Sequence, residues 1–287
     1  MRLDVSYDGT DFAGWAKQPG LRTVQGVLEA ALATIFHRDG DSPAITVAGR
    51  TDAGVHATGQ VAHVDLTERQ VARLARPHGS RPAPEPGAAL ARRLNGIAGL
   101  SSDVVVRSAR VAPVGFDARF SPVWRAYRYR IADAAAERNP LHRRFTVWHP
   151  AELDAEAMEE AARSLLGLHD WAAYCRPRAG ATTIRELQEF SWHREADGVL
   201  VAELRADAFC HSMVRALVGA AVAVGEGDLP GRRLVGIREE ARRTSEFRVM
   251  PAAGLTLVEV GYPADEELAS RALQTRARRD ASFDPGD

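Results

Sequence analysis

The spacing of apolar residues changes along this chain, and this change constrains the fold more than any other feature. Leu3, Val5 and Tyr7 alternate with polar residues, which is typical of a half-buried strand. Residues 24–36 instead carry apolar side chains at i, i+3, i+4 and i+7, behind the N-cap residue Thr23, as in an amphipathic helix. A chain that moves between these two periods predicts an α+β fold in which helices cover a sheet.

The expected elements follow the same order twice. Each half should contain a strand, a helix, two strands, a helix and a strand, although the residues themselves show no convincing repeat. Two such βαββαβ (ferredoxin-like or RRM-like) halves can share one antiparallel sheet, with helices on one face and a central active-site cleft. The predicted strands and helices are residues 3–7, 24–36, 45–48, 60–66, 68–76 and 104–106, then 125–131, 155–166, 186–193, 199–205, 209–224 and 255–260.

Length sets the domain organisation. A chain of 287 residues with 45% hydrophobic residues can bury a sizeable core as one large domain or two of ordinary size. We predict an N-terminal α+β half over residues 1–115, a C-terminal α+β half over residues 116–263, and a charged tail over residues 264–287 that is a short helix followed by disorder.

Composition removes several classes of protein. No apolar stretch approaches the length of a membrane span and the N-terminus lacks a signal-peptide core, so the expected location is the cytoplasm without membrane contact. Cys175 and Cys210 lie in no metal or redox pattern and are expected to be inert thiols. A net charge of −1 means that any basic surface must be local, as in residues 119–130, which hold four arginines and no acid.

Asp52 lies in a loop between two expected strands, where functional groups are commonly displayed. Gly49 and Gly54 flank Arg50-Thr51-Asp52 and leave room for a ligand to approach. Taken alone, the segment is more typical of a turn in which the carboxylate only caps backbone amides. The loop by itself therefore does not decide the chemistry.

The whole set of motifs, however, resembles the TruA-type tRNA pseudouridine synthases, also called tRNA pseudouridine 38–40 synthases. Residues 49–56, Gly-Arg-Thr-Asp-Ala-Gly-Val-His, match the family signature without a mismatch. Further motifs follow in the family order between residues 3 and 262. They are residues 7–15, 24–26, 116–121, 125–129, 209–219 and 254–257.

The resemblance implies isomerisation of uridine to pseudouridine at positions 38, 39 and 40 of the anticodon stem-loop of tRNA, with neither cofactor nor metal. It also implies a homodimer in which one tRNA spans both subunits. Asp52 would be the nucleophile on a flipped uridine, and the sequence leaves open whether it attacks C1′ of the ribose or C6 of uracil. Arg215, matched to the helix arginine of the family, should pair with Asp52 and keep it ionised.

Tyr127 corresponds to the active-site tyrosine of the family, whose ring can stack on the flipped uracil while its hydroxyl approaches C5. On a strand, Arg125, Tyr127 and Tyr129 share one face, whereas Arg128 and Arg130 share the other. One of these faces should meet RNA.

Arg50 is expected to enter the helical stack and hold open the gap left by the target base, because its planar guanidinium can both stack and donate hydrogen bonds. The predicted substrate-binding residues are Arg50, Tyr127, Arg125 and Leu255. Asp11, Gln18 and Asn95 are secondary candidates that are equally consistent with structural roles.

The other histidines and the departures from the family pattern give weaker evidence for a function. His56 and His63 suggest a metal site only weakly, because strand alternation separates the candidate ligands, and His211 on the turn before Arg215 is better explained by a structural hydrogen bond. Asp117 stands where many family members carry His, and residues 73–91 are longer and richer in proline than a minimal version. That segment would be either a tRNA contact or a solvated insertion.

Two other classes of protein remain alternatives. A non-catalytic RNA-binding protein on the same scaffold would keep arginines and aromatics but would not need Asp52. An aspartate-nucleophile hydrolase would normally need a phosphate loop or metal-binding carboxylates, and the sequence has no such cluster.

Overall fold

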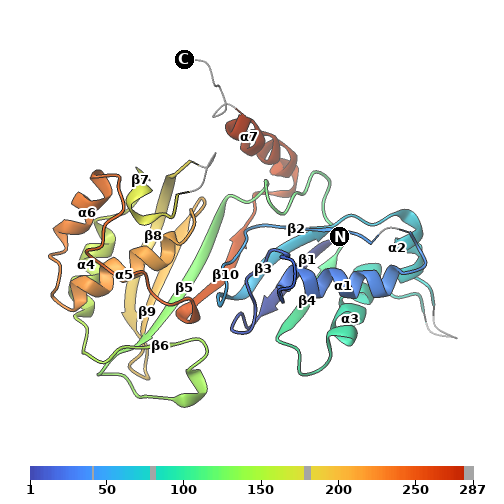
Figure 1. The fold of residues 1–287 in the computed structure, drawn as a ribbon. Helices are drawn as coiled ribbons and strands as arrows, with labels where there is room; N and C mark the ends of the chain where they lie inside the picture. The colour runs from blue at the N-terminus through green and yellow to red at the C-terminus, as the bar shows by residue number, and fades with distance from the viewer. Residues whose placement is uncertain (41, 78–81, 178–181, 281–287) are drawn as a thin grey trace. The chain divides into compact units, whose positions relative to one another are not determined.

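The chain divides into two compact units in the computed structural model (Figure 1). Unit 1 comprises Met1–Pro122 and Val260–Asp287, and unit 2 comprises Val123–Glu259. Both are mixed α+β and their strands pair mostly antiparallel, as the alternating periods predict. The residues that the structure describes are 1–40, 42–77, 82–177 and 182–280.

The strands of unit 1 centre on β1 (Arg2–Tyr7). This strand pairs antiparallel with β3 (His56–Val64) on one side and with β4 (Val104–Arg110) on the other, and the short β2 (Ile45–Val47) extends the sheet beyond β3. Burial alternates along β1, so one face of the strand packs inward. The inward residues are Leu3, Val5 and Tyr7.

Three helices complete the main body of unit 1. They are α1 (Val24–Phe36), α2 (Glu68–Leu74) and α3 (Pro86–Ala98). The predicted bounds of α1 are confirmed, and its N-cap Thr23 accepts a hydrogen bond from the backbone N–H of Gly26. Helix α3 packs on β4 and against α1 and α2.

Helix α3 is not among the predicted elements, because its proline-rich start is typical of a loop. Pro86 occupies the first turn, where its missing N–H is no cost, and the Glu85 side chain caps the helix through the backbone N–H of Ala88 at 2.6 Å. Gly87 lies so close to Ala109 of β4 that a Cβ there would overlap the Ala109 carbonyl. The prolines and glycine therefore start a helix rather than exclude one.

Unit 2 is built on a sheet in the strand order β10-β5-β9-β8-β7. The hairpin β8/β9, predicted to turn at Asp197-Gly198, is confirmed, and Gly198 takes the positive φ of 83° that such a turn requires. A short strand, β6, runs parallel to β5. The bounds are β5 (Trp124–Ala132), β6 (Val147–Trp148), β7 (Gly167–Asp170), β8 (Ile184–Arg194), β9 (Leu200–Ala206) and β10 (Leu255–Gly261).

The helices of unit 2 are α4 (Ala155–Arg163), α5 (Met213–Gly225) and α6 (Arg232–Glu239). Figure 1 shows α4 and α5 side by side, and α4 packs on β8. Helix α5 is buried along nearly its whole length. The expected start at residue 209 is wrong, because Ser212 adopts a left-handed φ of 64° and the helix begins after it.

Cys175 and Cys210 are joined as a disulfide with a Cα–Cα distance of 5.7 Å, which corrects the expectation of two inert thiols. Their separation of 35 residues gives no hint of proximity. Folding brings them together because the end of η2 (Ala172–Tyr174) runs beside the segment before α5, where the backbone N–H of Arg176 donates to the carbonyl of His211 at 2.9 Å.

The tail forms the helix α7 (Leu268–Asp280), which confirms the expected short helix and belongs to unit 1. It packs on residues 115–122, where the hydroxyl of Ser121 donates to the carbonyl of Leu268 and Arg276 forms an ion pair with Asp117 at 2.6 Å. The expected disorder of residues 281–287 lies outside the described part of the chain. The remaining short helices are η1 (Pro140–His142), η3 (Ala252–Gly254) and η4 (Asp265–Glu267). Within the described residues, no helix combines the length and the apolar content needed to cross a bilayer.

Candidate active site

Asp52 lies in the loop of residues 48–55 that joins β2 to β3. This loop is shorter than predicted, because β3 begins at His56 rather than at residue 60. Arg50 is exposed and Asp52 is partly exposed, whereas Thr51 between them is buried. The loop therefore exposes the guanidinium of Arg50 and, in part, the carboxylate of Asp52, on either side of the buried Thr51.

Main-chain hydrogen bonds hold this loop along its length. The backbone N–H of Ala48 donates to Val61, that of Trp15 donates to the carbonyl of Thr51 at 3.0 Å, and that of Gly54 donates to Phe12. The N–H of Val55 closes a turn onto the carbonyl of Asp52 at 3.2 Å. These bonds place the backbone of Asp52 between fixed points on both sides.

Glycines allow the segment after β1 to approach the Asp52 loop closely. Gly14 has a φ of 97°, and a Cβ there would lie 2.9 Å from the carbonyl oxygen of Thr51. A Cβ on Gly9 would overlap the carbonyl group of Val55. Residues 9–14 and the Asp52 loop therefore pack backbone to backbone.

His56 and His63 have structural partners in unit 1. The Nδ1 atom of His56 accepts the backbone N–H of Gly9 at 3.0 Å and lies 3.2 Å from the Asp8 carboxylate. The Nδ1 atom of His63 accepts the backbone N–H of Ala118, and burial lowers the pKa of this imidazole. Among the described residues, no group of three or more His, Cys, Asp or Glu side chains is arranged to hold a metal ion.

Tyr127 and Arg125 lie on β5 in unit 2. In the pairing with β9, Tyr127 is opposite Leu204, and its ring meets that of Phe209 edge to face with centroids 5.1 Å apart. Arg125 donates from Nη1 to the carbonyl of Asp207 at 2.8 Å. Both side chains are thus placed beside the segment that leads into α5.

Arg215 projects from α5 and is partly buried. Its Nε–H donates to the carbonyl of Met250 at 2.6 Å, which leaves the two Nη groups able to serve another acceptor. Tyr129, two residues after Tyr127, is buried and donates its hydroxyl to the carbonyl of Pro251 at 2.7 Å. Burial raises the pKa of Tyr129 although the nearby Arg215 acts in the opposite direction. Tyr129 therefore has a structural role, and Arg215 lies near it.

The opposite face of β5 carries balanced charge. Arg128 pairs with Glu203 at 2.7 Å, and Arg130 pairs with Glu195 and lies 3.6 Å from Asp197. Arginines paired with acids in this way offer little net positive charge to a phosphate backbone. The face that carries Arg125 and Tyr127 is consequently the better candidate for RNA.

The secondary candidates have structural contacts. Gln18 donates to the carbonyl of Ala13, and Asn95 of α3 exchanges two 2.8 Å hydrogen bonds with the backbone of Val106 in β4. Asp11 is exposed.

Two other residues noted in the sequence also have defined places. Arg73, in the long segment 73–91, pairs with Asp39 at 2.7 Å. His211 precedes α5 rather than lying on it, because the helix starts later than predicted.

The predicted site residues thus fall into two groups. Arg50 and Asp52 share one loop of unit 1, whereas Arg125, Tyr127, Arg215 and the buried Leu255 belong to unit 2. The pairing of Asp52 with Arg215 would join the two units and stays a prediction. A buried polar cluster that joins the loop to the sheet was not predicted from the sequence. It consists of Tyr7, Thr51 and Gln60.

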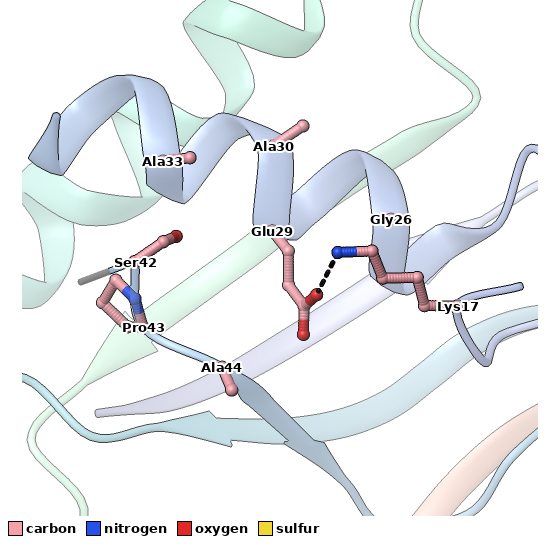
Figure 2. Close-up of a pocket in the computed structure, with 8 residues that line it drawn as sticks. All are labelled: Lys17, Gly26, Glu29, Ala30, Ala33, Ser42, Pro43 and Ala44. Atoms are coloured by element: carbon pink, nitrogen blue, oxygen red, sulfur yellow. Dashed lines mark hydrogen bonds and ion pairs between the residues drawn. The ribbon is translucent and has the colours of Figure 1, made fainter. Parts of the chain in front are cut away.

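Figure 2 shows a separate pocket of about 370 Å³ beside α1. Its carboxylate, Glu29, lies 3.5 Å from Nζ of Lys17 and accepts the backbone N–H of Ile45 at 3.2 Å. Small side chains form much of the remaining wall. The lining residues are Lys17, Gly26, Glu29, Ala30, Ala33, Ser42, Pro43 and Ala44, and none of them is a predicted site residue.

Comparison with known proteins adds a family to this geometry. A family model described as tRNA pseudouridine synthase matches residues 5–85 and 161–263. A tRNA pseudouridine synthase A of Leifsonia xyli is 64% identical over 279 residues, which cover 97% of each chain. The protein of that name from Streptomyces avermitilis is 52% identical, covering 97% of this chain and 93% of its own, and that from Mycobacterium leprae is 49% identical, covering 97% and 95%. A chain of a solved Cbf5-Nop10-Gar1 complex aligns with a TM-score of 0.32 and 8% identity, covering 78% of this chain and 55% of that chain.

Proposed function

Because the chain belongs to the tRNA pseudouridine synthase family and is therefore a pseudouridine-forming isomerase, we propose that it acts on uridines 38, 39 and 40 of the tRNA anticodon stem-loop through Asp52. The observation that carries this proposal is the display of Asp52 on a loop whose backbone is held on both sides. Such a loop can present one carboxylate to a flipped base with little freedom to move.

The reaction exchanges one glycosidic bond for another. The bond between N1 of uracil and C1′ breaks, the base turns, a bond forms between C5 and C1′, and the proton on C5 leaves. A carboxylate can serve by attacking C1′, which holds the ribose as an ester while the base turns, or by adding to C6 of the base. Asp52 fits either course, and no step calls on a metal or cofactor.

In this proposal Arg215 and Tyr127 support the nucleophile. The Nη groups of Arg215 would pair with Asp52 and keep it ionised. Tyr127, already packed edge to face on Phe209, would stack on the flipped uracil and bring its hydroxyl toward C5. Both roles require Asp52, Arg215 and Tyr127 to act on the same flipped uridine.

The remaining contacts would hold the RNA. The exposed guanidinium of Arg50 would fill the gap left by the flipped base, and Arg125 and Leu255 would line the substrate-binding face. We further propose a cytoplasmic homodimer in which one tRNA spans both subunits.

Release of tritium from tRNA that carries 5-tritiated uridine tests the proposal, because the hydrogen on C5 is lost only when the new bond forms. We expect Asp52→Asn to reduce release by at least about a thousandfold, the scale seen when a nucleophile is removed, while tRNA binding is retained. Asp228→Asn, which changes an exposed acid of unit 2, is the control and should keep full activity. If the unmodified protein binds tRNA but releases no tritium, the non-catalytic RNA-binding alternative is correct instead.

A further inference from the structure

We propose that Tyr7 and Gln60 are positioning residues for pseudouridine formation, acting on Asp52 through the buried side chain of Thr51. The three side chains form one line of hydrogen bonds beneath the active-site loop, which we name the Gln60–Tyr7–Thr51 relay. This inference rests on the proposed role of Asp52.

The relay links two strands of the sheet to the loop at two points. Nε2 of Gln60, on β3, donates to the Tyr7 hydroxyl at 3.2 Å and to the carbonyl of Gly49 at 2.9 Å. The Tyr7 oxygen, at the end of β1, lies 2.8 Å from Oγ1 of Thr51. Gly49 and Thr51 are thus tied to the sheet on the N-terminal side of Asp52.

The chemistry of the amide fixes the donor in the bond between Gln60 and Tyr7. An amide NH₂ can only donate, so the Tyr7 oxygen accepts from Gln60. In the bond between Tyr7 and Thr51 either hydroxyl can be the donor. Oε1 of Gln60 accepts the backbone N–H of Val61 at 3.1 Å, which fixes the orientation of the amide.

The relay is buried. Gln60 is 0% exposed, Tyr7 is 4% exposed and Thr51 is 6% exposed. Each of these polar groups would lose solvation without its partner, so the three bonds hold one another in a single arrangement. The ring of Tyr7 is itself held by Phe12 and Trp15, with centroids 6.5 Å and 5.9 Å away.

Thr51 is the residue through which the relay reaches the nucleophile. Its carbonyl is held by the N–H of Trp15 and its hydroxyl by Tyr7, so both its backbone and its side chain are fixed one residue before Asp52. Without the hydroxyl of Tyr7, the side chain of Thr51 would lose this hydrogen bond and the loop would lose one of its anchors ahead of Asp52. A shift of about 1 Å in a reacting group can lower a rate on the order of a hundredfold.

The experiment compares kcat, KM for tRNA and the urea midpoint of unfolding in three variants. Tyr7→Phe and Thr51→Val each remove one hydroxyl and leave a side chain of similar shape. We expect either change to lower kcat about ten- to a hundredfold with KM changed less than about twofold. The double variant should be no slower than the slower single variant, because both changes break the same bond.

Tyr174→Phe is the matched control. Tyr174 is equally buried, and its hydroxyl donates to the carbonyl of Leu234 in unit 2 at 2.8 Å. Losing that hydroxyl should lower stability about as much as Tyr7→Phe does but leave kcat unchanged. Thr51→Ser keeps the hydroxyl and should retain most of kcat. The comparison of Thr51→Ser with Thr51→Val therefore tests the relay even if Tyr7→Phe fails to fold.

The relay is refuted if Thr51→Val keeps full kcat, or if Tyr174→Phe loses as much kcat as Tyr7→Phe at the same stability. Effects that multiply in the double variant also refute it. An active Asp52→Asn enzyme overturns the proposed nucleophile and, with it, the relay. An inactive Asp52→Asn enzyme together with full kcat in Tyr7→Phe and Thr51→Val overturns only the relay.

Discussion

Replacing Gly9 by alanine should strongly destabilise the protein, because no neighbouring side chain can move to make room. A Cβ on Gly9 would overlap the carbonyl oxygen and carbon of Val55, and it would lie 3.1 Å from the backbone nitrogen of His56. These atoms belong to the end of the Asp52 loop and the first residue of β3. Relief therefore requires the backbone of one segment to move away from the other.

The magnitude follows from two losses. Forcing an extra carbon into a packed site costs about 1–3 kcal/mol, and backbone neighbours place this case at the upper end. Moving the segments apart also breaks the 3.0 Å hydrogen bond from the Gly9 N–H to Nδ1 of His56, which adds about 1 kcal/mol. We expect Gly9→Ala to lower the free energy of unfolding by about 3–4 kcal/mol in total.

Urea denaturation of Gly9→Ala and of the matched variant Gly96→Ala measures this effect. Gly96 lies on the exposed side of α3, and a Cβ there meets no atom within 4 Å. Alanine at that position should raise stability by about 0.5–1 kcal/mol, because glycine is a poor helix former. If Gly9→Ala loses less than about 1 kcal/mol and keeps full kcat, the close packing of residues 9–14 on the Asp52 loop is refuted.

Three further predictions concern other contacts. Burial lowers the pKa of His63, so the unfolded chain binds this proton more readily and stability should fall as the pH drops below about 6.5. The urea midpoint should fall less between pH 7 and pH 5 in His63→Gln than in the native protein, and an equal fall would contradict this. Reduction of the Cys175–Cys210 disulfide should cost about 2–4 kcal/mol, measured as a lower Tm in reductant that a double serine variant does not show. Arg194→Leu should lower the free energy of unfolding in urea by about 3–5 kcal/mol, because Asp133, whose side chain is 0% exposed, loses its partner at 2.7 Å. The double variant Arg194→Leu with Asp133→Asn should lose less stability than Arg194→Leu alone.

The sequence predicted those elements whose own residues show a regular apolar spacing or a helix cap. Helix α1 has both a regular apolar stripe and a side-chain cap, and its bounds were predicted correctly. The start of β3 was missed because its register shifts opposite Val5 and Tyr7, so that the neighbouring residues His56 and Ala57 are both buried and the alternation disappears. The bulge is a property of the pairing with β1, which a local pattern does not contain.

The same distinction applies to the site. The loop that carries Asp52 could be found from its motif, because the residues that display the carboxylate are adjacent in sequence. Gln60 gave a weaker indication of its role. In the sequence it is a polar residue beside the apolar Val61 and Ala62, and only the structure shows that its amide is fully buried. Its partner Tyr7 could not be assigned without the register that places Gln60 opposite Val5.

The composition of the Asp52 loop explains why polar side chains hold it from below. Between the buried residues Ala48 and Val55, Gly49, Ala53 and Gly54 present almost no apolar area, so hydrophobic burial holds the middle of the loop less than it holds α1. A loop made of small residues leaves space for an RNA base but must take its rigidity from directional bonds. Main-chain bonds supply part of this rigidity, and the Gln60–Tyr7–Thr51 relay ties the loop to two neighbouring strands. Loss of a single hydroxyl in that relay should therefore affect turnover more than it affects tRNA binding, since the RNA contact that we propose is made by the exposed Arg50 and not by the buried relay.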